Sequence, residues 1–131
     1  GLHIALWAAT KGADKFIFST TNNPEKCQNH PIINYLRDIS CEIIICKCDI
    51  TSLKDVKKMI HTRKISGIFH LANTLEDCSI LSINHERIRN GFHPKAIGAK
   101  NLHDATKENH VSLFIMFSSL AAAFGNIGQA I

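Results

Sequence analysis

The sequence contains no long hydrophobic run and no recognisable targeting segment. No apolar stretch approaches the ~20 residues that a membrane-spanning helix needs. The first residues also lack the basic start and the small-residue cleavage site of a signal peptide. Internal repeats and low-complexity stretches are absent as well. We therefore expect a globular protein with no membrane partner.

Metal-ligand patterns are also missing. The eight histidines are dispersed without an H-x-x-x-H pair. Cys46 and Cys48 form a C-x-C on one face of a strand-like run, but no second pair follows at ligand spacing. We assign no metal ligand and expect buried thiols. Five cysteines, an odd number, without a secretory signal favour reduced thiols and a cytoplasmic location.

What is present is the composition of one globular domain. The chain has 131 residues, of which 45% are hydrophobic and 20% are charged. The net charge of +4 is mild and its lysines and arginines are scattered, which disfavours nucleic acid as a partner. Because Gly1 stands where a free-standing chain would begin with methionine, we expect the sequence to be cut from a longer one.

Helical and strand-like periods alternate along the chain. The apolar pattern predicts helices at residues 2–9, 32–39, 53–60 and 86–108, with Thr51 or Ser52 capping the third. It predicts strands at residues 15–20, 42–48, 65–72 and 111–117. Strands separated by helices require crossover connections and a parallel sheet. The nearly continuous apolar strands suggest cover on both faces. The sequence thus predicts an α/β fold, a Rossmann-like doubly wound parallel sheet with helices on both faces.

Polar residues follow each predicted strand. In a doubly wound sheet, ligands bind just outside the carboxyl ends of the strands. Each position taken singly is compatible with a turn or a backbone cap. Their recurrence at successive strand ends favours a cofactor groove. The positions are Thr20, Thr21 and Asn22, then Asp49, then Asn73 and Thr74, and finally Ser118 and Ser119.

Five motifs in order give the sequence a specific resemblance. They are GLHIALWAATKGA at residues 1–13, CDIT at 48–51, ISGIFHLA at 65–72, PKAIGAKNL at 94–102, and FSS at 117–119 followed by GNIGQA at 125–130. On these motifs the chain resembles the ketoreductase domain of modular polyketide synthases and animal-type fatty acid synthases. That domain is a branch of the short-chain dehydrogenase/reductases. The resemblance covers the whole chain.

The resemblance implies a reaction and partners. It implies hydride transfer from NADPH to a β-keto group on an acyl chain held by an acyl carrier protein domain, with other synthase domains in the same polypeptide. It gives Ser119 the hydrogen bond to the ketone oxygen. It gives Lys95 the task of lowering the pKa of a tyrosine that protonates the alkoxide. That tyrosine would fall at position 132 and the family's first strand before Gly1. We therefore expect a chain truncated at both ends, inactive and poorly stable by itself.

The resemblance also implies a cofactor site and a stereochemical class. Gly1 matches the last glycine of the phosphate loop and Asp49 the residue that meets the adenine. Residues 75–77 (LED) resemble the L-D-D signature of the class that makes the D-configured hydroxyl, and Phe124 stands where the opposite class has tryptophan. The full set of candidate cofactor-binding residues is Gly1, Thr20, Thr21, Asp49, Ile50, Ala72 and Asn73.

Two departures leave other interpretations open. Thr21 stands where the family has an arginine that pairs with the 2′-phosphate of NADPH, and Asn73 replaces a glycine. They motivate the alternative of a degenerate, non-catalytic Rossmann subdomain that acts as a scaffold. A free-standing NAD-dependent reductase is a third interpretation, which the upstream Lys95 and the GNIGQA motif disfavour. Retention of Lys95 and Ser119 at matching spacing favours the enzyme.

Overall fold

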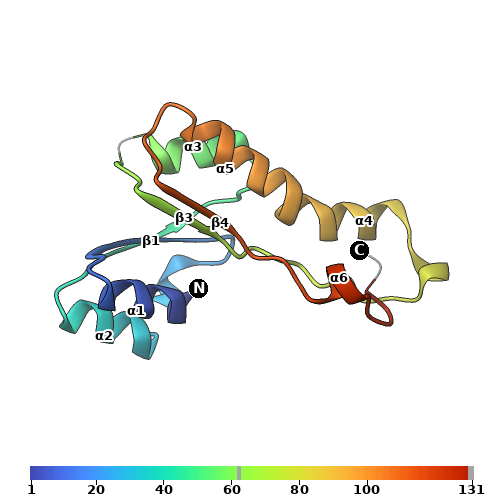
Figure 1. The fold of residues 1–131 in the computed structure, drawn as a ribbon, viewed down its shortest axis with the longest axis horizontal. Helices are drawn as coiled ribbons and strands as arrows, with labels where there is room; N and C mark the ends of the chain where they lie inside the picture. The colour runs from blue at the N-terminus through green and yellow to red at the C-terminus, as the bar shows by residue number, and fades with distance from the viewer. Residues whose placement is uncertain (62, 130–131) are drawn as a thin grey trace. The chain divides into compact units, whose positions relative to one another are not determined.

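The chain folds as two compact units, Gly1–Asp49 and Ile50–Ile131. The computed structural model describes residues 1–61 and 63–129 (Figure 1), so Ala130 at the end of the GNIGQA motif lies outside the described residues. Each unit contains one pair of parallel strands with helices packed against it. The predicted alternation of helices and parallel strands is thereby confirmed.

The first unit contains the elements that the periodicity predicted for residues 1–48. Helix α1 ends where Gly12 takes a φ of +96°, a conformation that favours glycine. Pro31 occupies the first turn of α2, where its missing N–H costs nothing, and Nδ1 of His30 accepts a hydrogen bond from the Ile32 amide. The elements are α1 (Leu2–Thr10), β1 (Lys15–Thr20), the 3₁₀ helix η1 (Pro24–Cys27), α2 (Pro31–Asp38) and β2 (Glu42–Lys47).

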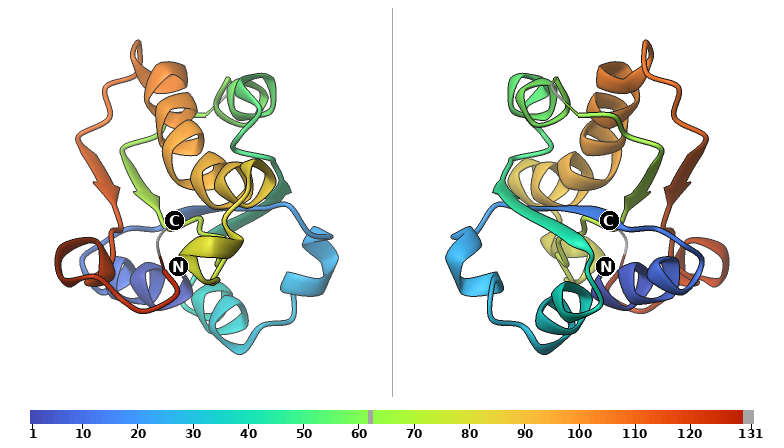
Figure 2. Two further views of the ribbon diagram at one scale, coloured as in Figure 1. Left: turned by 90° about the vertical axis from the view of Figure 1, so that its right-hand side faces the viewer. Right: turned by 90° about the vertical axis from the view of Figure 1, so that its left-hand side faces the viewer.

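Strands β1 and β2 pair in parallel from Lys15 opposite Glu42 to Thr20 opposite Lys47. Helices α1 and α2 lie on the same face of this pair (Figures 1 and 2). The core of the unit includes Ile33 and Leu36, both almost completely buried on α2. This α2 stripe was predicted from the apolar spacing, and its burial anchors the helix to the sheet.

The second unit contains the remaining elements. The predicted strands at 65–72 and 111–117 are both shorter than expected. The predicted helix at 86–108 is present as one continuous helical run, but its middle turn is a π-helix. The elements are α3 (Leu53–Ile60), β3 (Gly67–His70), the 3₁₀ helix η2 (Ile80–Ser82), α4 (His85–Phe92), the π-helix η3 (His93–Ile97), α5 (Gly98–Thr106), β4 (Leu113–Met116) and α6 (Ala121–Phe124).

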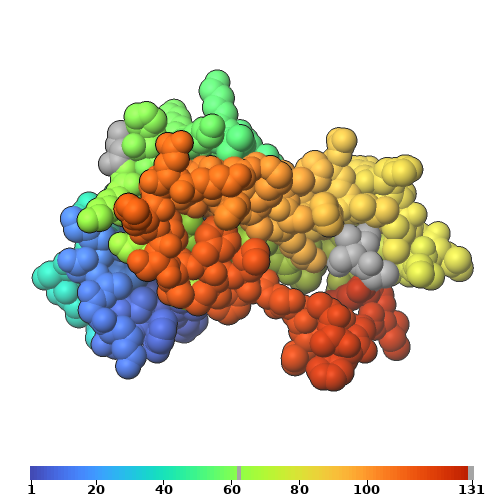
Figure 3. Space-filling view, turned by 45° about the horizontal axis from the view of Figure 1, so that its top comes forward, coloured from blue at the N-terminus to red at the C-terminus, as the bar shows by residue number. Residues whose placement is uncertain are grey.

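Helices α3 and α5 pack side by side on one face of the parallel β3–β4 pair (Figures 1 and 2). Ser52 caps α3, since its hydroxyl accepts a hydrogen bond from the Asp55 amide at 3.3 Å. Val56 of α3 and Leu102 of α5 are buried between the layers. Figure 3 shows that the segments carrying α4 and α6 extend away from this packed part.

Among the described residues, no helix is long and apolar enough to cross a membrane. The strands are mostly half-buried, and His70 is the one described strand residue that is buried. Cys48 is buried too, whereas the other four cysteines are half-buried. The expectation of buried thiols is therefore met fully only at Cys48.

We predict low stability for the 131-residue chain when it is expressed by itself. The largest fully buried side chains are Ile33, Leu36 and Val56, whereas Trp7 is 55% exposed and Leu81 94% exposed. So small a core offsets little of the conformational entropy lost on folding. Circular dichroism on heating should show a broad transition below the range of about 45–65 °C typical of mesophilic domains. A sharp transition above that range would contradict the prediction.

Candidate active site

Lys95 lies in a distorted turn of the long helical run of the second unit. Pro94 precedes it and has no backbone N–H, so the bond that an α-helix would make to the Asn90 carbonyl cannot form. The run widens to the π-helix η3 at this point. The Gly98 amide donates both to the His93 carbonyl and to the Lys95 carbonyl. Lys95 itself is exposed. The distortion therefore sits at the residue that the family resemblance makes catalytic.

His70 connects this turn to the sheet. It is the last residue of β3, and its side chain is only 6% exposed. Its Nε2 lies 3.0 Å from the Lys95 carbonyl oxygen. Because a carbonyl only accepts, Nε2 carries the proton and donates it. The backbone of Lys95 is thus fixed to the carboxyl end of β3.

Ser119 follows the neighbouring strand end. His70 stands opposite Met116 in the register of β3 and β4, and the Phe117 amide donates to the His70 carbonyl at 3.0 Å. Ser119 is exposed, and its hydroxyl accepts a hydrogen bond from the Ala121 amide at 3.2 Å. Its own proton can still be donated to a ligand. The second unit therefore brings the chain segments of both predicted catalytic residues to the end of β3.

Ile50, Ala72 and Asn73 belong to the same unit. Ala72 and Asn73 lie two and three residues after the end of β3 and are exposed. Ile50 is buried against the start of α5: a methyl group added at Gly98 would lie 2.6 Å from its Cδ1 and 3.4 Å from Cε1 of His70. Only glycine allows the helix to approach this closely without displacing a neighbour. The close approach explains why a glycine inside this helix is tolerated.

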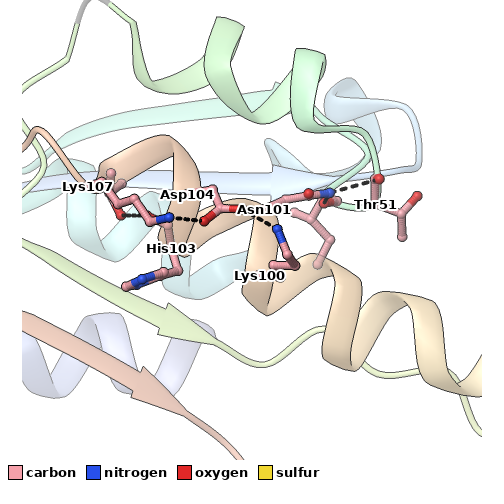
Figure 4. A network of polar contacts seen from close by, with 8 residues as sticks. Thr51, Lys100, Asn101, His103, Asp104 and Lys107 are labelled. Carbon is pink, nitrogen blue, oxygen red and sulfur yellow. Dashed lines mark hydrogen bonds and ion pairs between the residues drawn. The ribbon is translucent and has the colours of Figure 1, made fainter.

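Asn101 secures the connection that precedes α3. Its Nδ2 donates to the carbonyls of Ile50 and Thr51, both at 2.9 Å, and its side chain is 8% exposed. The bond to Thr51 is drawn in Figure 4. Both carbonyls belong to the CDIT motif. Asn101 and His70 lie within the motifs of the family resemblance, but the sequence assigned neither a role, because their partners lie 51 and 25 positions away.

A second group of polar residues on α5 needs no ligand to explain it. Lys100 and Lys107 both contact Asp104, the latter at 2.7 Å (Figure 4). The hydrogen bond from Lys100, then that from Lys107, lowers the pKa of Asp104 to about 2. Opposite charges three and four residues apart are neighbours on a helix surface. These are surface ion pairs of the helix.

The first unit holds the other four predicted cofactor-binding residues. β1 and β2 end side by side, because the Cys48 amide donates to the Thr20 carbonyl at 2.9 Å, and exposed Asp49 follows at once. The Thr20 hydroxyl accepts from the Asn22 amide, and Thr21 is exposed. Gly1 caps α1 without a side-chain bond, and the first turn carries no acidic residue. These features suit a phosphate-bearing ligand at the helix terminus.

The LED segment meets the GNIGQA segment, about fifty residues further along the chain. Gln129 Nε2 donates to the Asp77 carboxylate at 3.3 Å, and the Cys78 amide donates to the Gly128 carbonyl at 2.8 Å. Glu76 pairs with Arg87 at 3.8 Å. Asp77 is therefore held by the loop that follows α6 rather than lying in an isolated turn.

Comparisons with known proteins agree with this arrangement. The sequence profile of the KR domain matches residues 1–131. The highly reducing polyketide synthase VdtX of Byssochlamys spectabilis is 31% identical over 132 residues, which cover 99% of this chain and 6% of that protein. A phenolphthiocerol/phthiocerol polyketide synthase of Mycobacterium tuberculosis is 30% identical over 139 residues, covering 99% of this chain and 7% of that protein.

Solved structures give the same result. The first ketoreductase of the tylosin PKS superposes with a TM-score of 0.89 at 26% identity, over 98% of this chain and 29% of that one. An N-terminal ketoreductase from the macrolactin assembly line superposes with a TM-score of 0.79 at 29% identity, over 88% of this chain and 24% of that one. The predicted Rossmann-like fold class is confirmed. The chain spans less than a tenth of the length of the two synthases named above.

We predict that Asn101→Ala destabilises the intact protein. The change leaves the Ile50 and Thr51 carbonyls without their donor, at a cost of about 1–3 kcal/mol in the free energy of unfolding. Urea denaturation measures the loss. Asn34→Ala is the matched control, because Asn34 is exposed on α2 and a surface change there costs less than about 0.5 kcal/mol. Equal losses in the two variants would show that the Asn101 bonds contribute nothing.

Proposed function

Because the chain belongs to the KR-domain family, we propose that it forms part of a ketoreductase of a multidomain polyketide synthase. Its substrate is a β-ketoacyl chain carried by an acyl carrier protein domain, and its product is the β-hydroxyacyl chain. The observation that carries the proposal is local. Lys95 is bonded through its backbone to the last residue of β3, and Ser119 follows the strand paired with β3.

The two side chains divide the work on the ketone. Ser119 donates a hydrogen bond to the ketone oxygen and polarises the carbonyl, which favours attack at the β-carbon. Lys95 contributes a positive charge that stabilises the developing alkoxide and lowers the pKa of the group that protonates it. Both side chains are exposed in the described structure and so are accessible to a substrate.

NADPH supplies the hydride when it is bound. Gly1, at the start of α1 where no side chain caps the helix, would meet the pyrophosphate, and Asp49 and Ile50 the adenine side. Thr20, Thr21, Ala72 and Asn73 complete the set. Thr21 offers no cation for the 2′-phosphate, but exposed Lys47 stands opposite Thr20 in the β1–β2 register. Lys47 is our candidate for that contact.

The partners follow from the relatives. The polyketide synthases that match are many times longer than this chain, which supports further synthase domains in the same polypeptide. A cytoplasmic location is part of the proposal. A degenerate scaffold is the second candidate, and Thr21 and Asn73 are the observations that favour it. Activity and cofactor-binding measurements on matched variants separate the two candidates.

We predict that Ser119→Ala and Lys95→Ala each lower kcat/KM for a β-ketoacyl thioester. Removing an oxyanion donor or a general acid-base partner costs about 10²–10³-fold. Ser118→Ala and Lys100→Ala are the matched controls. Ser118 is the exposed serine next to Ser119. Lys100 is an exposed lysine of the same helical run and pairs with Asp104, four residues further along. Steady-state oxidation of NADPH by the intact protein measures the effect. Equal activity in all four variants would contradict the roles of Ser119 and Lys95, whereas no NADPH oxidation by the wild type would favour the scaffold.

We predict that Thr21→Arg tightens NADPH binding while leaving NADH binding nearly unchanged. A charge-assisted hydrogen bond contributes about 1.5–3 kcal/mol, or roughly 10–100-fold in Kd. Fluorescence titration with both cofactors measures binding directly, independently of turnover. Asn22→Arg adds the same charge one position further along an exposed loop and is the control. Equal tightening by both arginines, or none by either, would place the phosphate elsewhere.

A further inference from the structure

His70 is a buried polar residue that the proposed chemistry does not use. It makes no contact with a reacting group in the mechanism above, yet it is the only buried residue among the described strand residues. Its Nε2 lies 3.0 Å from the Lys95 carbonyl, and its Cε1 would lie 3.4 Å from a Cβ added at Gly98. Burying an imidazole has a cost unless its nitrogens are satisfied, so the bond to Lys95 helps to keep it in place.

The hydrogen bond from His70 reaches a turn whose backbone hydrogen bonds are not those of a regular α-helix. In a regular α-helix, a carbonyl accepts from the amide four residues ahead. Here the Lys95 carbonyl accepts a hydrogen bond from the Gly98 amide, only three residues ahead. His70 Nε2 supplies a further donor to the same oxygen. A carbonyl has two lone pairs, so both donors can be accommodated. The direction of the Lys95 peptide is therefore set partly by a side chain from β3.

The backbone of His70 contacts the other half of the site. Its carbonyl accepts the Phe117 amide at 3.0 Å, and Ser119 follows two residues later. The same residue thus bonds to the segment leading to Ser119 through its main chain and to the turn carrying Lys95 through its side chain. Gly98 permits the close approach, because a methyl group there would lie 2.6 Å from Cδ1 of Ile50 and 3.4 Å from Cε1 of His70.

We propose that His70 is a positioning residue that sets the location of Lys95 relative to Ser119. The inference rests on the proposed function, because that function assigns the Lys95 side chain its catalytic role. His70 does not touch the substrate. By donating Nε2–H to the Lys95 carbonyl it holds the π-helical turn against the carboxyl end of β3. It thereby sets where the backbone of Lys95 lies relative to the segment that leads to Ser119.

The test compares His70→Gln with His70→Met in the intact protein. The two replacements are similar in length, but only glutamine keeps an N–H donor that can reach the Lys95 carbonyl. We expect His70→Met to lower kcat about 100-fold, as a displacement of about 1 Å in a catalytic group does. KM for the ketone should change little, because its binding contacts remain. His70→Gln should recover most of the lost kcat.

The control is His103→Met. His103 is an exposed histidine of α5 whose ring packs edge-on against Phe114 of β4, away from the bond between His70 and Lys95. It should retain wild-type kcat. Rates are compared per folded molecule, using near-ultraviolet circular dichroism. Equal kcat in the methionine and glutamine variants, or a loss confined to KM, would overturn the inference.

A second readout separates this inference from the proposed function. Reductive ¹³C-methylation labels lysines with their charge kept, and the Lys95 signal is assigned from Lys95→Arg. The signal should move in His70→Met and stay in place in His70→Gln and His103→Met. If the wild type reduces no ketone but the Lys95 signal moves as expected, the proposed function fails and the positioning role stands. If the wild type is active and the signal does not respond to His70→Met, the positioning role fails.

Discussion

The hydrogen bond between the His70 imidazole and the Lys95 carbonyl is the contact on which the geometry of the candidate site depends. It joins the last residue of a strand to the middle of a long helical run, 25 positions apart in the sequence. An exposed lysine on a regular helix would be free to follow the motions of its own helix. Here the turn that carries it is bonded to the strand pair, so its position is tied to the segment leading to Ser119.

Three small or restricted residues make the connection possible. Pro94 removes one backbone donor and opens the helix into its π turn. Gly98 keeps the space in which Ile50 and the His70 ring lie. Asn101, one turn further on, bonds to both carbonyls of the connection that starts α3. Each of the three would destabilise an isolated helix, because proline, glycine and asparagine all have low helix propensity. Their presence together within eight residues is explained by what the helix has to contact.

The sequence predicted the four strands and the four main helical runs, whereas the short helices η1, η2 and α6 were not predicted. The candidate residues came from the family resemblance. Apolar spacing predicted the stripes of α2 and α3. The α3 cap was narrowed to Thr51 or Ser52, because capping chemistry is local, and Ser52 is the one that caps. The π turn was not predicted, since Pro94 and Gly98 indicate only that the helix departs from regular geometry, and the contact with His70 comes from 25 positions away. Strands β3 and β4 are shorter and less buried than their apolar runs suggested, whereas β1 has the bounds that were predicted. Burial is decided by what packs against a strand, and periodicity within the strand does not report that.

The proposed cofactor site is where the residues of this chain differ most from what the family resemblance leads us to expect. Gly1 and Asp49 are the proposed contacts to the dinucleotide, yet Thr21 lacks the charge expected there, and exposed Lys47 stands opposite Thr20 on the paired strand. The central claim is hydride transfer to a carrier-bound ketone. Its most direct test is to supply the intact protein with deuterated NADPH and a β-ketoacyl thioester, and to analyse the product by mass spectrometry. The account predicts one deuterium on the β-carbon of a β-hydroxyacyl product. Binding of the cofactor with no deuterated product would contradict it and favour a scaffold.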